Sequence, residues 1–325
     1  MGKPYYINIG GGFTRTDRII EIAEQARRVD KNIQIQAYDA VQGLQWNGGR
    51  VIFNTKMEGI KLASNGQLYD VSIDNMQEAL RRVKKLNDHG IPFQLTLNNV
   101  LENIDLEDED GNFLLRHLEN DMNSVTVATR ALTWHVKQNY PKFKIMGSIC
   151  FCYGTLEEYR KACEIYDVVV MIPIFAYLPE IVSQLPVEKL SFILNDPCNL
   201  YCERKEHYRA LSRSSFAGMA TVDEQFQVRT IPTCYRKFPG FRSKIPDGLD
   251  EATCDRVQAI AEAQFESMGD PKLLPGGTNF NISGPARQEL LRLGVNHFKL
   301  QGREMNTAEY ERKVVEFLEA FMQEI

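Results

Sequence analysis

Two cysteines with a short spacing follow a predicted strand in the second half of the chain. The segment 190–195 is largely apolar and ends at Asn195, and Cys198 and Cys202 follow it, separated by three residues. Thiolates at this spacing in a loop can bind one metal centre together, and Cys234 can fold back to join them. Paired thiols in a polar loop are typical of redox or metal sites. We therefore predict a metal site that contains these three cysteines.

The residue types alone leave two kinds of metal centre open. Zinc accepts mixed tetrahedra of cysteine and histidine, so the three cysteines together with His207 would suit it. An iron–sulfur cluster would need a fourth thiolate. Cys152 and Cys150 are the nearest candidates, because they fall at the end of the predicted strand 143–149. The spacing of radical S-adenosylmethionine enzymes is not met, because Lys205 stands where their third cysteine would be.

The seven cysteines all lie between Cys150 and Cys254. An odd number of cysteines without a secretion signal argues against a disulfide framework. Cys163 and Cys254 fall in helical patterns, so we interpret both as small buried apolar residues. The first residues do not form a charged segment followed by an apolar one, and the apolar stretches are far shorter than the ~20 residues of a membrane helix. We expect a cytoplasmic protein that does not bind a membrane.

Four polar side chains fall at or just after predicted strand ends: Arg50, Asn98, Lys299 and Arg303. A guanidinium holds a carboxylate or phosphate through two hydrogen bonds, and an amide can recognise a carbonyl or a sugar hydroxyl. We predict that these four residues bind a polar or anionic substrate. A structural ion pair with an acid at the rim of the sheet is the alternative for Arg303.

The charge of the chain is unevenly distributed. The net charge is −5, yet residues 203–244 contain nine Lys or Arg against four acids. Within that segment, residues 235–244 interleave aromatic and basic side chains, a pattern that suits an RNA or DNA substrate. The overall negative charge favours the alternative of a solvated basic loop. The acidic run 102–110 lacks the spacing of a calcium loop, so we interpret it as an exposed turn.

The elements that must position these residues alternate between strand and helix. Such alternation, with seven or eight units in 325 residues, predicts a TIM-like (β/α)8 barrel, and a doubly wound open sheet is the alternative. Gly10-Gly11-Gly12 lacks the spacing of a dinucleotide-binding turn and predicts a tight turn. The predicted strands are 5–9, 33–37, 91–97, 125–128, 143–149, 168–174, 190–194 and 297–300.

The prediction for domain organisation is one barrel-like domain over residues 1–325. Residues 212–274 are rich in prolines, glycines and basic side chains, and we expect them to form an insertion that covers the carboxyl ends of the strands. Barrel enzymes place their active sites at that face. The segment 41–70 also has weak periodicity, and long irregular segments in compact domains are usually functional or mobile.

The motifs together resemble the peptidase U32-like family, over roughly residues 45–320. The resemblance is carried by the strand ending in Asn195 before Cys198 and Cys202, by the continuation 204–208, and by Phe-Lys-Leu-Gln-Gly-Arg at 298–303. It extends to the strand that ends at Asn98 and more loosely to Asn-Gly-Gly-Arg at 47–50.

This resemblance implies a TIM-like barrel and an oxygen-sensitive [4Fe–4S] cluster held by four cysteines. Characterised branches include oxygen-independent hydroxylases of ubiquinone precursors, and enzymes that hydroxylate pyrimidines in RNA with prephenate as the oxygen source. Cys198, Cys202 and Cys234 match later cysteines of the family. The fourth cysteine has no clear counterpart, and either Cys152 takes its place or one iron is left open.

The resulting expectation is an iron–sulfur enzyme that hydroxylates, or modifies by related redox chemistry, a nucleic-acid base or a small metabolite. A non-catalytic binding protein with a structural metal, or a subunit that works with a homologous or other partner, is the alternative. Peptidase activity is not expected, because the sequence contains neither His-Glu-x-x-His nor Gly-x-Ser-x-Gly.

Overall fold

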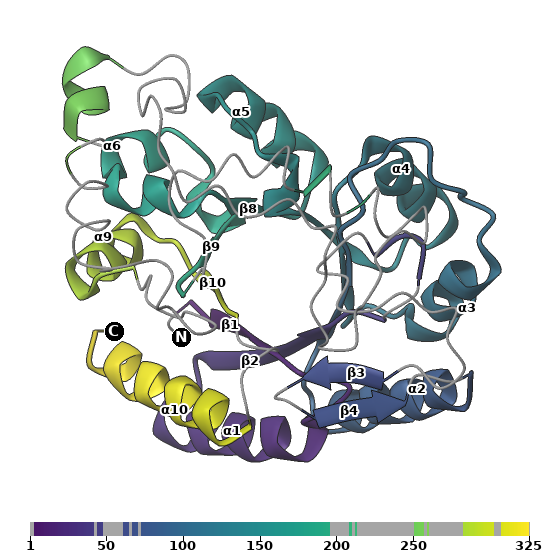
Figure 1. Ribbon diagram of the computed structural model, residues 1–325. Coiled ribbons are helices and arrows are strands. Elements are labelled where there is room, and N and C mark those ends of the chain that lie inside the picture. Colours follow the sequence, from purple (N-terminus) through teal and green to yellow (C-terminus); the bar gives the residue numbers. More distant parts are fainter. Residues whose placement is uncertain are drawn as a thin grey trace.

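Eight parallel strands close into a barrel in the computed structural model, in the order β1-β10-β9-β8-β7-β6-β5-β2. The predicted (β/α)8 architecture is therefore confirmed (Figure 1). The strands are β1 (Tyr5–Gly10), β2 (Ile33–Asp39), β5 (Phe93–Leu97), β6 (Ser124–Val127), β7 (Lys144–Gly147), β8 (Val168–Met171), β9 (Leu190–Ile193) and β10 (His297–Leu300). The structure describes residues 3–41, 44–47, 61–64, 67–70, 73–195, 208–209, 212, 250–256, 259, 282–301 and 307–324.

Helices follow the strands and surround the barrel. They are α1 (Thr16–Val29), α2 (Ile73–Asp88), α3 (Glu109–Leu118), α4 (Arg130–Asn139), α5 (Leu156–Ile165), α6 (Pro179–Val182), α9 (Gly284–Leu293) and α10 (Thr307–Glu324). Each long helix buries an apolar stripe on the sheet, as α1 does with Ile19, Ile22, Ala23 and Ala26. Thr155 and Glu158 form a capping box that begins α5. In the described part of the chain, we find no helix with the length and apolar character needed to cross a membrane.

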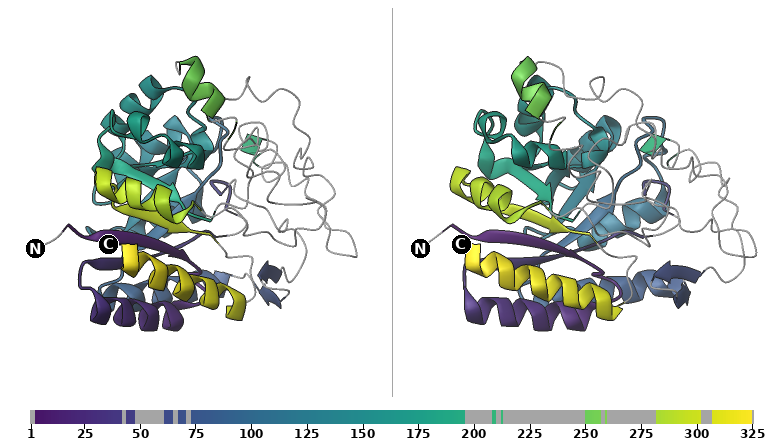
Figure 2. Two further views of the ribbon diagram at one scale, coloured as in Figure 1. Left: turned by 90° about the vertical axis from the view of Figure 1, so that its left-hand side faces the viewer. Right: turned by 60° about the vertical axis from the view of Figure 1, so that its left-hand side comes forward.

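The closure of the barrel joins the first strand of the chain to the last. β1 pairs in parallel with both β2 and β10. The turn after β1 requires its glycines, because Gly11 has a φ of 96° and a side chain on Gly12 would lie 2.6 Å from the Phe93 ring. The amino-terminal end of β1 and the carboxyl-terminal end of α10 lie on one side of the barrel. The hairpin of β3 (Lys61–Ser64) and β4 (Gln67–Asp70) lies on the other (Figure 2).

The inner side chains of the barrel form layers, each made from alternate strands. Residues such as Ile7 and Ile9 belong to the core between sheet and helices, so the residue between them faces the barrel axis. Strand registers then define a middle, an upper and a top layer, the top layer being nearest the carboxyl ends. The middle layer contains Asn8, Gln94, Met146 and Ser191. The upper layer contains Tyr38, Thr126, Val170 and Lys299. The top layer contains Gly10, Thr96, Ser148 and Ile193.

Two segments differ from the sequence-based expectation. The acidic run 102–110 was expected to be an exposed turn, but its last two residues begin α3. Asp108 accepts a hydrogen bond from the Gly111 N–H at 2.7 Å, and acids in a first turn stabilise a helix amino terminus. Within the irregular segment 41–70, β3 (Lys61–Ser64) and β4 (Gln67–Asp70) form an antiparallel hairpin. Most of the expected insertion 212–274 lies outside the described residues.

Candidate functional site

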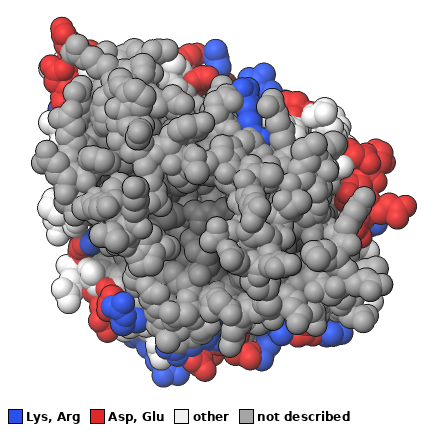
Figure 3. Space-filling view, viewed as in Figure 1, with Lys and Arg blue, Asp and Glu red and all other residues white. Residues whose placement is uncertain are grey.

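The barrel interior is polar near the carboxyl ends of the strands, at the face where barrel enzymes bind their substrates. In most such barrels, Val, Ile and Leu dominate these layers. Here the three layers contain one charged side chain, two carboxamides, one phenol and several hydroxyls. Lys, Arg, Asp and Glu side chains of the described residues lie around the rim of this face (Figure 3). The described interior therefore offers several polar groups that could bind a substrate.

Lys299 occupies the centre of this polar interior. Its side chain is 8% exposed, and its Nζ lies 3.8 Å from the centroid of the Tyr38 ring, in a cation–π contact. The same Nζ lies 3.5 Å from Oε1 of Gln94. The Tyr38 hydroxyl donates to the Leu300 carbonyl at 2.9 Å, which ties β2 to β10 across β1. This lysine, predicted to bind substrate, thus lies within the barrel and not on its outer surface.

Asn98 lies at the mouth of the barrel and is half-buried. The Ser148 hydroxyl donates to its Oδ1 at 2.9 Å, which joins the loop after β5 to the loop after β7. Ser148 also accepts a hydrogen bond from the Cys150 N–H at 3.1 Å. The structure brings Asn98 to the same face as Lys299, whereas Arg50 and Arg303 lie outside the described residues.

Cys152 follows a short 3-10 helix, η1 (Ile149–Phe151), on the same face. Its φ is 49°, and within the described ranges it is the one residue other than glycine in the left-handed region. Such conformations cluster at functional sites. Its thiol is half-buried, whereas Cys150 packs with Ala128, Val170 and Ile193 in the barrel interior. Of the two candidates for a fourth ligand, Cys152 is therefore the more accessible.

The other three expected ligands, Cys198, Cys202 and Cys234, lie outside the described residues. The described side chains alone form no group of three or more His, Cys, Asp or Glu that could hold a metal ion. Cys163 is buried in the core, where burial raises the pKa of its thiol to about 11 and keeps it protonated. Cys254 is half-buried and packs against the same core.

Sequence reasoning missed several inner residues, namely Asn8, Tyr38, Gln94, Thr96 and Thr126. A signal for them exists in the sequence. In Ile7-Asn8-Ile9 and in Phe93-Gln94-Leu95-Thr96-Leu97, a polar residue alternates with apolar ones along a strand. Both faces of a barrel strand are buried, so this alternation indicates a polar barrel interior and not a solvent-exposed face.

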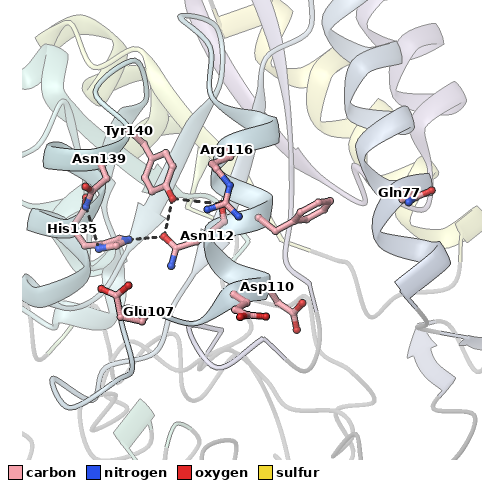
Figure 4. A pocket seen from close by; sticks show the side chains of 10 residues that line it. Gln77, Glu107, Asp110, Asn112, Arg116, His135, Asn139 and Tyr140 are labelled. Carbon is pink, nitrogen blue, oxygen red and sulfur yellow. Dashed lines mark hydrogen bonds between the residues drawn. The ribbon is translucent and has the colours of Figure 1, made fainter.

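A second cleft, of about 900 Å³, lies outside the barrel over α3 and α4 (Figure 4). At its centre, Oδ1 of Asn112 accepts hydrogen bonds from His135 at 2.8 Å and from the Tyr140 hydroxyl at 2.7 Å. Burial lowers the pKa of His135, so the imidazole is neutral near pH 7. These polar atoms hold one helix against the next. The lining residues are Gln77, Glu107, Glu109, Asp110, Asn112, Phe113, Arg116, His135, Asn139 and Tyr140.

Comparisons with known proteins give a limited result. No protein-family model matches the chain. No curated protein matches it either. A solved structure of the U32 peptidase Mk0906 is similar over 68% of this chain and 80% of that chain, with 15% sequence identity and a TM-score of 0.41. Similarity at this level does not assign the chain to a family, and the barrel architecture stands on the strand pairing described above.

Proposed function

We propose that this protein is a U32-like barrel enzyme that binds a polar or anionic substrate at the carboxyl ends of its strands. In this proposal, an iron–sulfur cluster lies beside the substrate, and the reaction is an oxygen-independent hydroxylation or a related redox modification. The substrate is a nucleic-acid base or a small metabolite. The motif resemblance around Asn195 and at 298–303 supports the choice of family.

The observation that carries the proposal is the position of Lys299. Lys299 buries its ammonium inside the closed barrel, below the face that barrel enzymes use, and this burial costs desolvation free energy. An aliphatic residue could fill the same position without that cost. Gln94 and Tyr38 hold this ammonium in place. An anionic or strongly polar substrate group can bind this ammonium, whereas it could not bind an aliphatic side chain at the same position.

The cluster would be held by Cys198, Cys202, Cys234 and Cys152. Four thiolates are the donor set that [4Fe–4S] clusters take. The half-buried Cys152 lies on the face where the strands end, and β9 ends at Ile193, five residues before Cys198 in the sequence. The loop after β7 and the loop after β9 are separated by one strand, β8. Cys152, the one member of this donor set that the structure describes, supports the proposal by its place on this face and its partial exposure. When bound, such a cluster supplies iron for electron transfer or for binding of substrate oxygen.

Anaerobic purification tests the cluster. We expect brown protein that contains iron and sulfide, and we expect Cys202→Ala to lose both because site formation and local folding are linked. Cys254→Ala is the matched control and should keep the metal of the unaltered protein. Zinc in stoichiometric amount, or normal iron in the Cys202→Ala protein, would contradict the proposal.

The reaction is tested in cells that contain or lack the protein. We expect the modified product to disappear from the RNA nucleosides or from the small metabolites when the protein is absent. Cells with Arg303→Ala should lose the product while the purified variant keeps its iron, because a guanidinium binds substrate and not metal. Unchanged nucleosides and metabolites, with the cluster present, would favour the non-catalytic alternative.

A further inference from the structure

Several buried polar atoms in the barrel interior make no hydrogen bond to any part of the chain that the structure describes. Asn8 is 0% exposed, and among the residues that the structure describes, neither Nδ2 nor Oδ1 of its amide has a partner. The same is true of the hydroxyls of Ser191, Thr126 and Thr96. An unsatisfied buried polar group costs about 1–3 kcal/mol, so native proteins rarely retain several of them in one place. Their clustering therefore points to a ligand.

These atoms lie in the layer of Lys299 and in the two layers next to it. Asn8 is its direct register neighbour on β1, and Ser191 lies in the same layer as Asn8. Thr126 belongs to the layer of Lys299 itself, and Thr96 belongs to the layer above. The site thus combines one ammonium, the amide N–H donors of one carboxamide and three hydroxyl donors. These three layers contain no Asp or Glu, so the one formal charge among their side chains is positive.

The layer above this site contains two small residues, Gly10 and Ser148. The layer between Lys299 and the carboxyl ends contains Gly10, Thr96, Ser148 and Ile193. A usual barrel would fill such a layer with Val, Ile or Leu, which pack the axis closed. Here Gly10 contributes no side chain, and Ser148 turns its hydroxyl to Asn98 at the mouth. At the face where the substrate is proposed to bind, these two residues fill less of the barrel axis than Val, Ile or Leu would, and Ile193 packs beside them with Val170 and Cys150.

We propose that Lys299, Asn8, Ser191, Thr126 and Thr96 form an oxyanion-binding site inside the barrel, which takes a carboxylate or phosphate group of the substrate. This inference rests on the proposed function and specifies the substrate class. Oxyanions are bound by ammonium and hydroxyl donors in charge-assisted hydrogen bonds, and in a water-poor interior such bonds are strong. Asn8 and Ser191 are then binding residues that lie below the lysine, and Gln94 and Tyr38 are positioning residues.

The test uses two probes, malonate for carboxylates and inorganic phosphate for phosphates. Binding of each is measured by calorimetry on the full-length protein, at constant ionic strength set with chloride, with iron and sulfide recorded for the same sample. We expect saturable binding of at least one probe. The probe that binds more tightly identifies which group the substrate carries.

Four variants assign the binding to this site. Lys299→Met should weaken it about tenfold to a hundredfold, because a hydrogen bond to a charged group is lost. Ser191→Ala and Thr126→Val should weaken it about threefold to tenfold, yet leave the melting temperature unchanged or raised, since these hydroxyls have no hydrogen-bond partner among the described residues. Lys84→Met, at an exposed lysine of α2, is the control and should bind as the unaltered protein does.

Three results would overturn the inference: absence of saturable binding of both probes, unweakened binding by Ser191→Ala and Thr126→Val, or a loss in Lys84→Met as large as in Lys299→Met. The two hydroxyl variants keep the test decisive if Lys299→Met does not fold. Failure of anion binding in protein that carries iron and sulfide rejects this site alone. Intact anion binding without any metal rejects the proposed cluster enzyme and leaves the oxyanion site standing.

Discussion

At the scale of single residues, closure of the barrel surrounds a side chain with residues that are distant from it in the sequence. The Nζ of Lys299 meets Tyr38 of β2 and Gln94 of β5, which are more than two hundred residues earlier in the chain. An exposed lysine at the end of a strand would be screened by water and salt. Inside the barrel, water and salt screen the same charge much less.

Asn195 is a residue whose structural role can be measured. Its Nδ2 donates to the Gln301 carbonyl at 2.7 Å, and its Oδ1 accepts from the Gln301 N–H at 2.6 Å. Asn195→Ala leaves both buried backbone groups without these partners, so we expect it to lower the free energy of unfolding by about 1–3 kcal/mol. Urea denaturation measures the change. Asn139→Ala, at an exposed amide of α4, should change it by less than about 0.5 kcal/mol.

His297 predicts a pH dependence of stability. Its ring stacks on Tyr6 at 4.5 Å between centroids, and burial, with nearby Lys144, lowers its pKa from 6.5 to about 4. Between these values the unfolded chain binds a proton that the folded protein does not, so stability falls as the pH falls from 6.5 to 4. We expect this histidine to contribute on the order of 2–3 kcal/mol to that loss.

The measurement is urea denaturation across this pH range. His297→Gln should show a smaller loss of stability than the unaltered protein, whereas His89→Gln, at an exposed histidine, should show the same loss. Carboxylates also contribute to acid unfolding. An identical pH dependence in all three proteins would therefore show that His297 titrates alike in the folded and unfolded chains, against the expectation.

At the scale of elements, α3 depends on one close approach. Trp46 is fully buried, and its indole N–H donates to the Asp105 carbonyl at 2.7 Å, which fixes the ring. A side chain on Gly111 would lie 2.5 Å from that ring. The helix therefore packs against the loop segment 44–47 only because residue 111 has no side chain.

Gly111→Ala should destabilise the protein by about 2–3 kcal/mol, since the overpacking against Trp46 outweighs the gain of about 1 kcal/mol in helix propensity. Thermal unfolding measures the effect. At Gly154 the nearest atom to an added side chain is Oε2 of Glu158 at 3.7 Å, so Gly154→Ala is the control and should change stability by less than about 0.5 kcal/mol. Equal melting temperatures for the two variants would contradict this account of α3.

At the scale of the whole molecule, the two ends of the chain complete the barrel. β1 and β10 pair with each other, and Asn296 donates to the Pro4 carbonyl at 3.0 Å beside that pairing. α9 and α10 cover this seam. Arg287 of α9 forms a bidentate ion pair with Glu324 of α10, and the two side chains are 13% and 10% exposed.

Breaking this pair from one side should be costly. We expect Arg287→Met to lower the free energy of unfolding by about 3 kcal/mol or more, because it leaves the Glu324 carboxylate buried and without its ion-pair partner. The double variant Arg287→Met with Glu324→Gln should be more stable than that single variant. Arg312→Met in the exposed pair with Glu316 should cost less than about 1 kcal/mol. Similar losses for both arginines would contradict a special role for the seam.

The sequence by itself determined the class of fold and much of the chain's local structure. Apolar segments of strand length that alternate with helical patterns require a parallel sheet covered by helices. Gly10-Gly11-Gly12 predicted a tight turn, and the structure confirms it through the positive φ of Gly11. Cys163 was correctly interpreted as a core residue. These features are local, because they depend on spacing along the chain and on the conformations open to each residue.

Only the tertiary structure decided which polar residues meet. Barrel closure and strand register bring Asn8, Ser191 and Lys299 into neighbouring layers, although they are far apart in the chain. Periodicity reports which face of a strand a residue occupies, but a register shift of one residue would turn that face around. The polar interior therefore follows from how the strands pair. The start of α3 was missed for a related reason, since its apolar face becomes visible only once Trp46 packs against Gly111.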